Sequence, residues 1–338
     1  MTALIILVGS AALATLSVGL IRRIAIARRM IDVPNERSSH TIPTPRGGGL
    51  GIVLVTLAGT LILGLLNLVP PNIVGAMLVG GLVAGIGYLD DQGGLSPLQR
   101  AFIHFIAAIF GVILLGGMPQ LDLGSTTLKW GWLGHLVAVV GTVWMINLYN
   151  FMDGIDGLAG SEAVFVFGIG GLLLINSGLG ELALLCALLV GSCLGFLRWN
   201  WPPAKIFMGD VASGFLGYLI AIIAIASGSA GFSLWVWLIL AGVFIVDSTV
   251  TLLRRVRHGE KWYEAHRSHA YQHLTQRWRS HRRVTATVLG INLLWLAPIA
   301  VALTIDAVWS PIGVAIGLLP MVLLAYLLDA GKETQKTL

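Results

Sequence analysis

The chain has 338 residues, of which 56% are hydrophobic and only 11% are charged. Soluble domains carry roughly 25% charged residues, so this composition excludes a protein that covers its whole surface in water. Its aliphatic runs reach the ~17–25 residues that cross a bilayer as a helix, and they lack the period-2 alternation of a membrane barrel. We therefore expect one all-α integral membrane domain, a polytopic bundle over residues 1–338.

Breaks at charged residues, prolines and glycine pairs predict eleven spans. They lie near residues 3–21, 48–68, 72–89, 97–117, 131–148, 159–177, 181–197, 211–227, 233–253, 284–304 and 310–329. The first span has no basic residue ahead of it and several arginines behind it, which predicts a retained helix rather than a signal peptide. We expect its N-terminus in the periplasm and, after eleven crossings, a cytoplasmic C-terminus.

The distribution of basic residues supports this topology. Every Lys and Arg except Lys129 falls in a loop that the alternation places inside, in agreement with the positive-inside rule. The polar residues collect in these same loops, near residues 22–47, 90–96, 149–158, 198–210 and 254–283. We expect these loops to form an active site on the cytoplasmic face of a bacterial inner membrane.

The first of these loops contains His40 and ends at Arg46, which three glycines follow. Glycines beside an arginine can cradle a phosphate group, although this pattern alone has low specificity. Asp90 and Asp91 directly follow the third span. Adjacent acids repel one another and are useful near a metal or as a base, while an ordinary interfacial pair of acids is the alternative.

Asn150, Asp153 and Asp156 lie where the fifth span ends, in the stretch Asn-Phe-Met-Asp-Gly-Ile-Asp-Gly. On a helical turn, two aspartates three residues apart share a face. Two carboxylates beside the bilayer need a partner, and Mg²⁺ or a polar ligand would serve. The alternative is an interfacial loop of Asx turns.

The stretch 200–210 contains Asn200, Phe207 and Asp210, with a glycine directly before the acid. An aromatic ring near a carboxylate suits a nucleobase stacked beside its metal-bound phosphates. An aromatic belt at the membrane interface, with Asp210 as a helix cap, is the alternative.

His266, His269 and His273 follow at spacings that would place them on one face of a helix. No cysteine or acid completes a closed zinc site there, so the sequence favours donors for phosphate oxygens over a loop that only binds lipid headgroups. Asp247, about two turns inside the ninth span, is a functional candidate because acids are costly in membranes. A structural bond to a neighbouring helix is an equal alternative.

Taken in order and on one face, these motifs resemble the polyprenyl-phosphate N-acetylhexosamine-1-phosphate transferases, or glycosyltransferase family 4. That family includes phospho-MurNAc-pentapeptide translocase and the undecaprenyl-phosphate GlcNAc-1-phosphate transferases. The resemblance covers residues 30–275 and includes the eleven-span topology. The loops around His40 and His273 look most like the branch that initiates O-antigen synthesis.

The resemblance implies a role for each matching residue. It implies metal and lipid-phosphate handling for Asp90 and Asp91, a catalytic place near the nucleotide for Asp153 and Asp156, and a Mg²⁺ ligand at Asp210. Substrate contacts are implied for the residues Asn150, Asn200, Phe207, His266, His269 and His273. Residues 22–47 contain no lysine, unlike the translocase branch, so Arg46 or His40 would substitute and a peptide-bearing substrate is disfavoured.

The activity implied is Mg²⁺-dependent transfer of an N-acetylhexosamine 1-phosphate from a UDP-sugar to undecaprenyl phosphate, with release of UMP. Mn²⁺ is a second metal to consider, and the sugar is GlcNAc or a 6-deoxy sugar such as FucNAc or QuiNAc. The expected partners are these substrates and membrane lipids, with no nucleic acid, and we also consider a homodimer.

The alternative functions are a proton-coupled transporter or lipid flippase, and a membrane scaffold. Against them, most acids lie at span ends, no internal repeat is visible, and a scaffold needs no acidic cluster.

Overall fold

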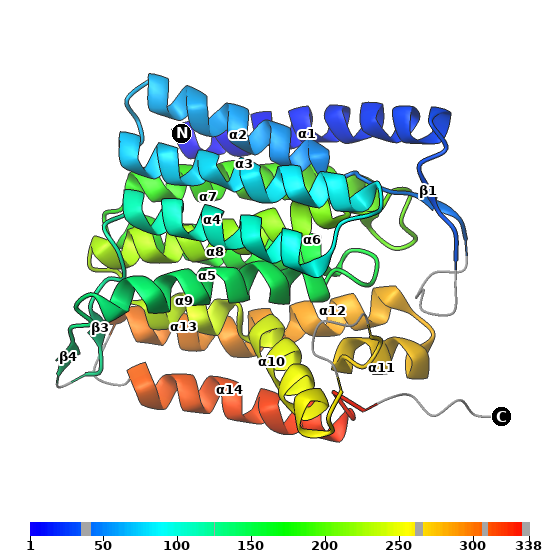
Figure 1. Cartoon of the computed structure of the whole chain (residues 1–338). Coiled ribbons are helices and arrows are strands. Elements are labelled where there is room, and N and C mark those ends of the chain that lie inside the picture. The colour runs from blue at the N-terminus through cyan, green and yellow to red at the C-terminus, as the bar shows by residue number, and fades with distance from the viewer. Residues whose placement is uncertain (35–41, 125, 261–265, 306–309, 333–338) are drawn as a thin grey trace.

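The computed structural model describes residues 1–34, 42–124, 126–260, 266–305 and 310–332. His40, a predicted substrate contact, lies outside them. Long helices run side by side through the molecule (Figure 1). They are α1 (Thr2–Ala27), α2 (Leu50–Leu65), α3 (Pro71–Asp91), α4 (Pro97–Leu114), α5 (Leu133–Phe151), α6 (Leu158–Asn176), α7 (Gly180–Asn200), α8 (Asp210–Ser229), α9 (Leu234–Leu240), α10 (Gly242–Arg257), α11 (Ala270–Trp278), α12 (His281–Ile291), α13 (Ala297–Ile305) and α14 (Ser310–Leu327).

The prediction of a polytopic all-α membrane protein is confirmed. Among the described residues, nine helices are long and apolar enough to cross a membrane, or ten when a bent pair counts as one span. The predicted span at 48–68 is the 16-residue helix α2. At 1.5 Å per residue it is about 24 Å long, shorter than a hydrocarbon core of ~30 Å.

The prediction of one continuous span at 233–253 was wrong. Its residues form α9 and α10, which meet at Ala241 with a bend of 74°. The helix α10 leaves the bundle obliquely and reaches the end of α14 (Figure 1). The span predicted at 284–304 is observed as α12 and α13, joined by a π-helical turn at Asn292–Leu296.

Local sequence explains where the helices begin. Pro71 and Pro97 occupy the first turns of α3 and α4, where a missing N–H costs nothing and the fixed φ suits a helix. Ser96 and Gln99 form a reciprocal capping box at the start of α4. This cap satisfies two backbone donors that otherwise have no partner.

Packing places α8 at the centre of the molecule. It contacts α3 and α5 extensively, and α1 packs along α7. A second, smaller apolar cluster joins α10, α11, α14 and the residues after α14. Its buried members are Val246, Val250, Ala270, Ala325 and Ala330.

The chain reversals bring the polar loops to one end of the bundle. The helices α3, α5 and α7 end there at Asp91, Phe151 and Asn200, and α8 begins there at Asp210. The short antiparallel pair β1 (Ile31–Asp32) and β2 (Thr44–Pro45) lies at this end, while the hairpin of β3 (Leu121–Asp122) and β4 (Thr127–Leu128) lies at the other (Figure 1).

Candidate active site

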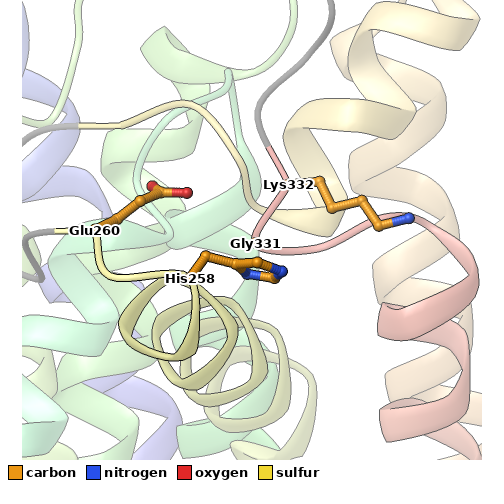
Figure 2. Close-up of a pocket in the computed structure, with 4 residues that line it drawn as sticks. All are labelled: His258, Glu260, Gly331 and Lys332. Carbon is orange, nitrogen blue, oxygen red and sulfur yellow. The ribbon is translucent and has the colours of Figure 1, made fainter.

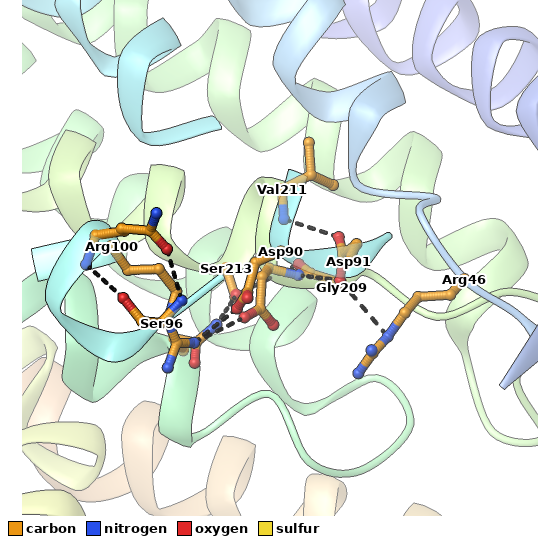
Figure 3. A network of polar contacts seen from close by, with 11 residues as sticks. Arg46, Asp90, Asp91, Ser96, Arg100, Gly209, Val211 and Ser213 are labelled. Carbon is orange, nitrogen blue, oxygen red and sulfur yellow. Dashed lines mark hydrogen bonds and ion pairs between the residues drawn. The ribbon is translucent and has the colours of Figure 1, made fainter. Parts of the chain in front are cut away.

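The adjacent acids that end α3 face different partners. The carboxylate of Asp91 accepts the backbone N–H groups of Asp210 and Val211 at 3.0 and 3.1 Å, and its side chain is only 3% exposed. Asp91 therefore caps the N-terminus of α8 and holds Asp210 in place (Figure 3). Gly209 allows this approach, because its φ is +80° and a Cβ would overlap the Asp91 carboxylate.

The carboxylate of Asp90 instead reaches the start of the next helix. It pairs with Arg100 Nη1 at 2.7 Å, and the same nitrogen lies 3.6 Å from Asp210 Oδ2. The Asp90 and Asp210 carboxyl groups are themselves within hydrogen-bonding reach. Two acids and one arginine thus converge where α3, α4 and α8 meet (Figure 3).

Arg46 approaches the same acids from the first loop. Its Nε lies 3.6 Å from Asp91 Oδ1, and its Nη2 lies 3.8 Å from Asp32. Burial alone would lower the pKa of Arg46, but the surrounding carboxylates, foremost Asp91 and Asp210, outweigh burial and raise that pKa above its ordinary value. Arg46 is therefore a permanent positive charge beside the acidic cluster.

Two of the three glycines after Arg46 use their N–H groups within the protein. The N–H groups of Gly48 and Gly49 donate to the carbonyls of Phe207 and Met208 at 2.8 and 3.0 Å. The N–H of Phe207 in turn donates to the carbonyl of Pro45 at 2.8 Å. These bonds fix the loop before α8 against the first loop, so the Phe207 backbone is held next to Asp210.

Asp153 and Asp156 do not share a helix face, because residues 153–156 are not helical. Half-buried Asp153 faces the acidic cluster, where burial and then the charge of Asp210 raise its pKa well above the ordinary value. Asp156 instead accepts the N–H of Ala204 at 2.9 Å and lies 3.1 Å from His281 Nδ1. The predicted catalytic roles of Asp153 and Asp156 stay predictions, while the contacts of Asp156 show that it positions the loop at Ala204.

Two predicted substrate-binding amides also make bonds within the protein. Asn200 is buried, accepts the N–H of Gly157 at 2.8 Å and donates to the Ile206 carbonyl at 2.9 Å. Asn150 donates to Ser213 Oγ at 2.8 Å and so links α5 to α8. Substrate contact by these amides stays a prediction, while the structure shows what each one positions.

The histidines are not arrayed on one helix face, so that expectation was wrong. His266 precedes α11, His269 is its N-cap, and His273 lies inside it. The rings of His266 and His269 stack with centroids 5.0 Å apart, and both lie near the ring of Phe151. The Tyr271 hydroxyl donates to the Phe151 carbonyl at 3.0 Å, so this segment, residues 266–273, is held against the turn that carries Asp153. We call residues 266–273 the histidine segment.

The charge states of two of these histidines follow from their surroundings. Burial, together with the neighbouring His269 ring and the charge of Arg255, lowers the pKa of His266 to about 3. A neutral imidazole still offers one N–H donor, so His266 suits a hydrogen bond rather than an ion pair with phosphate. Burial also lowers the pKa of His273, which faces Asp329 and the Lys332 backbone.

Asp247 has a structural explanation. Its carboxylate accepts the backbone N–H groups of Ala270 and Tyr271 at 2.9 and 3.0 Å, and lies 3.3 Å from His269 Nδ1. A carboxylate that accepts the first donors of a helix is an N-cap supplied from another element. Asp247 therefore joins α10 to α11 and orients His269.

Arg100 is the residue that sequence reasoning missed. Its guanidinium bridges Asp90 and Asp210, yet in the sequence it is one of many arginines. The available signal was its place four residues after Ser96, in the first turn of a capped helix that directly follows the aspartate pair. Glu162 was missed as well; it is buried inside α6 and accepts a hydrogen bond from Asn292.

The residues at this end fit a magnesium ion that shares its ligands with a substrate. The described residues hold no group of three or more His, Cys, Asp or Glu arranged for a metal. Mg²⁺, however, is commonly bound by one or two carboxylates together with substrate phosphates and water. Asp90 and Asp210 are the two carboxylates placed for that role, with Asp153 nearby.

Comparison with known proteins shows the family to which this chain belongs. A family model described as glycosyl transferase family 4 matches residues 73–228. A probable undecaprenyl-phosphate N-acetylglucosaminyl 1-phosphate transferase of Bacillus subtilis is 30% identical, over 86% of this chain and 82% of its own. The chain belongs to glycosyl transferase family 4.

Other relatives agree with this membership. A decaprenyl-phosphate N-acetylglucosaminephosphotransferase of Mycobacterium leprae is 30% identical, over 83% of this chain and 78% of its own. A phospho-N-acetylmuramoyl-pentapeptide-transferase of Microcystis aeruginosa is 31% identical, over 71% of this chain and 68% of its own. The predicted resemblance is confirmed, and so is the prediction of an enzyme, a phosphoglycosyltransferase. The resemblance to the O-antigen branch stays a prediction.

Proposed function

We propose that this family 4 enzyme transfers an N-acetylhexosamine 1-phosphate from a UDP-sugar to undecaprenyl phosphate, at the end of the bundle where α3, α4 and α8 meet. The observation that carries the proposal is the pairing of Arg100 with Asp90 and Asp210 and of Arg46 with the adjacent Asp91. Acids for a divalent ion and cations for phosphates are the groups that two polyanionic substrates require. The names of the relatives support a polyprenyl-phosphate acceptor.

The chemistry is a phosphoryl transfer between two phosphates. An oxygen of the lipid phosphate attacks the β-phosphorus of the UDP-sugar, and the bond from that phosphorus to the bridging oxygen of UMP breaks. The products are the polyprenyl-diphospho-sugar and UMP. Because a phosphate monoester has a second pKa near ~6, the nucleophile is mostly dianionic at neutral pH and needs little help from a base.

The protein's own residues then position the two substrates and neutralise the negative charge of their phosphates. Arg100 and Arg46 are placed to bind phosphate oxygens, and Asp91 fixes the N-terminus of α8, whose dipole favours negative charge. Asp90 and Asp210 would hold Mg²⁺, which supplies charge neutralisation when bound. Phe207 and the histidine segment are the candidates for binding the uridine and the sugar diphosphate.

Substrate identity and sidedness are part of the proposal. GlcNAc is the first donor to test because the relatives of Bacillus subtilis and Mycobacterium leprae are named for it, and the 6-deoxy sugars follow. The first loop lacks a lysine between residues 22 and 47, which disfavours a peptide-bearing donor. We place the active site in the cytoplasm of a bacterium, with initiation of O-antigen or another surface polysaccharide as the pathway step.

The test is a UMP-release assay with purified protein, undecaprenyl phosphate and a panel of UDP-N-acetylhexosamines. We expect UMP with at least one donor, loss of activity on metal removal and recovery with Mg²⁺. Asp210→Asn should lower turnover by ~10²-fold or more, while the matched Asp122→Asn, in β3 at the opposite end of the bundle, should not. Absence of UMP with every donor would overturn the proposal. Near-normal turnover of Asp210→Asn in saturating Mg²⁺ would overturn the metal assignment alone.

A further inference from the structure

Residues 328–332, which follow α14, fold back onto the histidine segment. The N–H of Gly331 donates to the Ser268 carbonyl at 2.7 Å, and Asp329 pairs with Arg277 of α11 at 3.2 Å. Ala330 is fully buried in the small cluster formed with Val246 and Val250 of α10. We call residues 328–332 the C-terminal clamp, because they join α10, α11 and α14.

Gly331 is the residue that makes this approach feasible. Its φ is +79°, and a Cβ there would lie 2.8 Å from both Arg254 Cβ and the Thr251 carbonyl oxygen. Both obstacles belong to α10, and one of them is backbone. A side chain at position 331 therefore forces the clamp away from α10 and lengthens the bond to Ser268.

The bond to Ser268 leads directly to a predicted substrate contact. The Ser268 hydroxyl lies 3.0 Å from His266 Nδ1 and 3.5 Å from Arg255 Nη1. The clamp fixes the carbonyl of the same buried residue. Asp247 fixes the other side of the segment through Ala270 and Tyr271, so the position of His266 depends on two anchors.

An open pocket lies between the C-terminal clamp and the end of α10. It is lined by His258 and Glu260, which follow α10, and by Gly331 and Lys332 of the clamp (Figure 2). Glu260 is held by Arg255 at 2.6 Å, the same arginine that approaches Ser268. The clamp thus contacts the histidine segment at Ser268, whereas the turn that carries Asp153 contacts it through Tyr271.

We propose that Asp329 and Gly331 are positioning residues, which hold the histidine segment in its place for the sugar-nucleotide donor. The inference rests on the proposed function for the identity of that donor. The clamp acts on residues 266–273, whereas Asp90, Arg100 and Asp210 are held by α3, α4 and α8. Loss of the clamp should therefore weaken use of the donor and leave use of the lipid acceptor unchanged.

The experiment compares Gly331→Ala and a chain ending at residue 327 with the full-length protein. Hydrogen exchange without substrates should become faster in residues 266–273, with little change in α3 and α8. In the UMP assay, KM for the UDP-sugar should rise about tenfold, while KM for undecaprenyl phosphate stays within about twofold. Asp329→Asn should give a smaller change in the same direction, because the pair with Arg277 is half-exposed.

Two controls match these variants. Gly231→Ala introduces a side chain at another positive φ, +90°, where nothing lies within 4 Å, in the connection from α8 to α9. A chain ending at residue 332 keeps the clamp while shortening the terminus. Both should behave as the full-length protein in exchange and in both KM values.

The outcomes separate the inference from the function on which it rests. Faster exchange in residues 266–273 supports the clamp even if no protein releases UMP, a result that would overturn only the proposed function. Unchanged exchange and unchanged KM values in Gly331→Ala and the truncation would overturn the clamp. Equal acceleration of exchange throughout the bundle would also overturn it, because the clamp would then support the whole fold.

Discussion

The two aspartates that end α3 can do different work because successive residues on a helix point about 100° apart. Asp91 turns inward to the first N–H groups of α8, and Asp90 turns toward Arg100 on α4. The charge of Asp91 is thus matched within the protein by helix donors and Arg46. Asp90 is the member of the pair left beside Asp210, where the substrates' phosphates would lie.

We predict that Asp153 makes the effect of a divalent ion depend on pH. Its folded-state pKa is raised by burial and by Asp210, above the ordinary value of about 3.9. Its ionised form is therefore disfavoured, and stability is lost as pH rises from that value through the raised pKa. A bound cation would stabilise the ionised carboxylate and so offset this loss of stability. Mg²⁺ should therefore raise the Tm more at pH 8 than at pH 5.

The measurement is thermal unfolding of the detergent-purified protein with and without Mg²⁺ at both pH values. Asp153→Asn removes the titrating group and should reduce the difference between the two Mg²⁺ effects. An equal Mg²⁺ effect at pH 5 and pH 8 in the unmodified protein would show that Asp153 does not sense the ion. An undiminished difference in Asp153→Asn would assign the effect to another acid.

At the level of single residues, the sequence predicted which residues lie near one another at the site, but not which of them form hydrogen bonds or ion pairs. Asp210, Asp90 and Arg46 were expected at one face, and the structure brings them together. Whether Asn200 faces a ligand or the Ile206 carbonyl depends on loops distant in sequence. Spacing contains no such information, and for the same reason Arg100 did not stand out from the other arginines.

At the level of elements, α11 depends on a cap from another helix. Its N-cap is His269, which forms a capping box with Gln272. The N–H groups of Ala270 and Tyr271 donate to Asp247 of α10. A short helix of nine residues is marginal by itself. The position of α11, and with it His269, therefore follows α10.

Asp247→Asn tests this cap. One carboxylate oxygen becomes an NH₂ group facing a backbone N–H, so a buried donor loses its acceptor at a cost of ~1–3 kcal/mol. We expect a lower Tm and faster hydrogen exchange in α11, with activity falling in parallel. Asp122→Asn, in the hairpin at the opposite end, is the control. Activity lost while exchange in α11 stays unchanged would instead assign Asp247 a direct role with substrate.

Element boundaries were predictable where composition decides them. Long aliphatic runs flanked by charges gave most of the membrane helices, because burial of apolar surface in lipid depends on length and hydropathy. The break at Ala241 was missed, because α9 and α10 together are long and apolar enough to read as one span. Beyond the bend, α10 packs against α14, a contact that hydropathy does not encode.

At the level of the whole molecule, charge distribution predicts which side of the membrane each end of the bundle faces. The end with Arg46, Arg100 and the histidine segment has nearly all the basic residues, and the hairpin of β3 and β4 precedes Lys129. Basic loops are retained in the cytoplasm. A cytoplasmic active site would give a soluble UDP-sugar direct access to a lipid phosphate at the membrane surface.

Single-cysteine accessibility tests this orientation. Lys129 and Lys205 are both exposed and lie at opposite ends, and the native Cys186 and Cys193 are buried. In intact bacterial cells, a membrane-impermeant maleimide should label Lys129→Cys, and it should label Lys205→Cys only after permeabilisation. The unmodified protein is the control for background labelling. The reverse labelling pattern would place the acidic cluster outside the cytoplasm, where no UDP-sugar is supplied. Labelling of both positions in intact cells would contradict a fixed orientation.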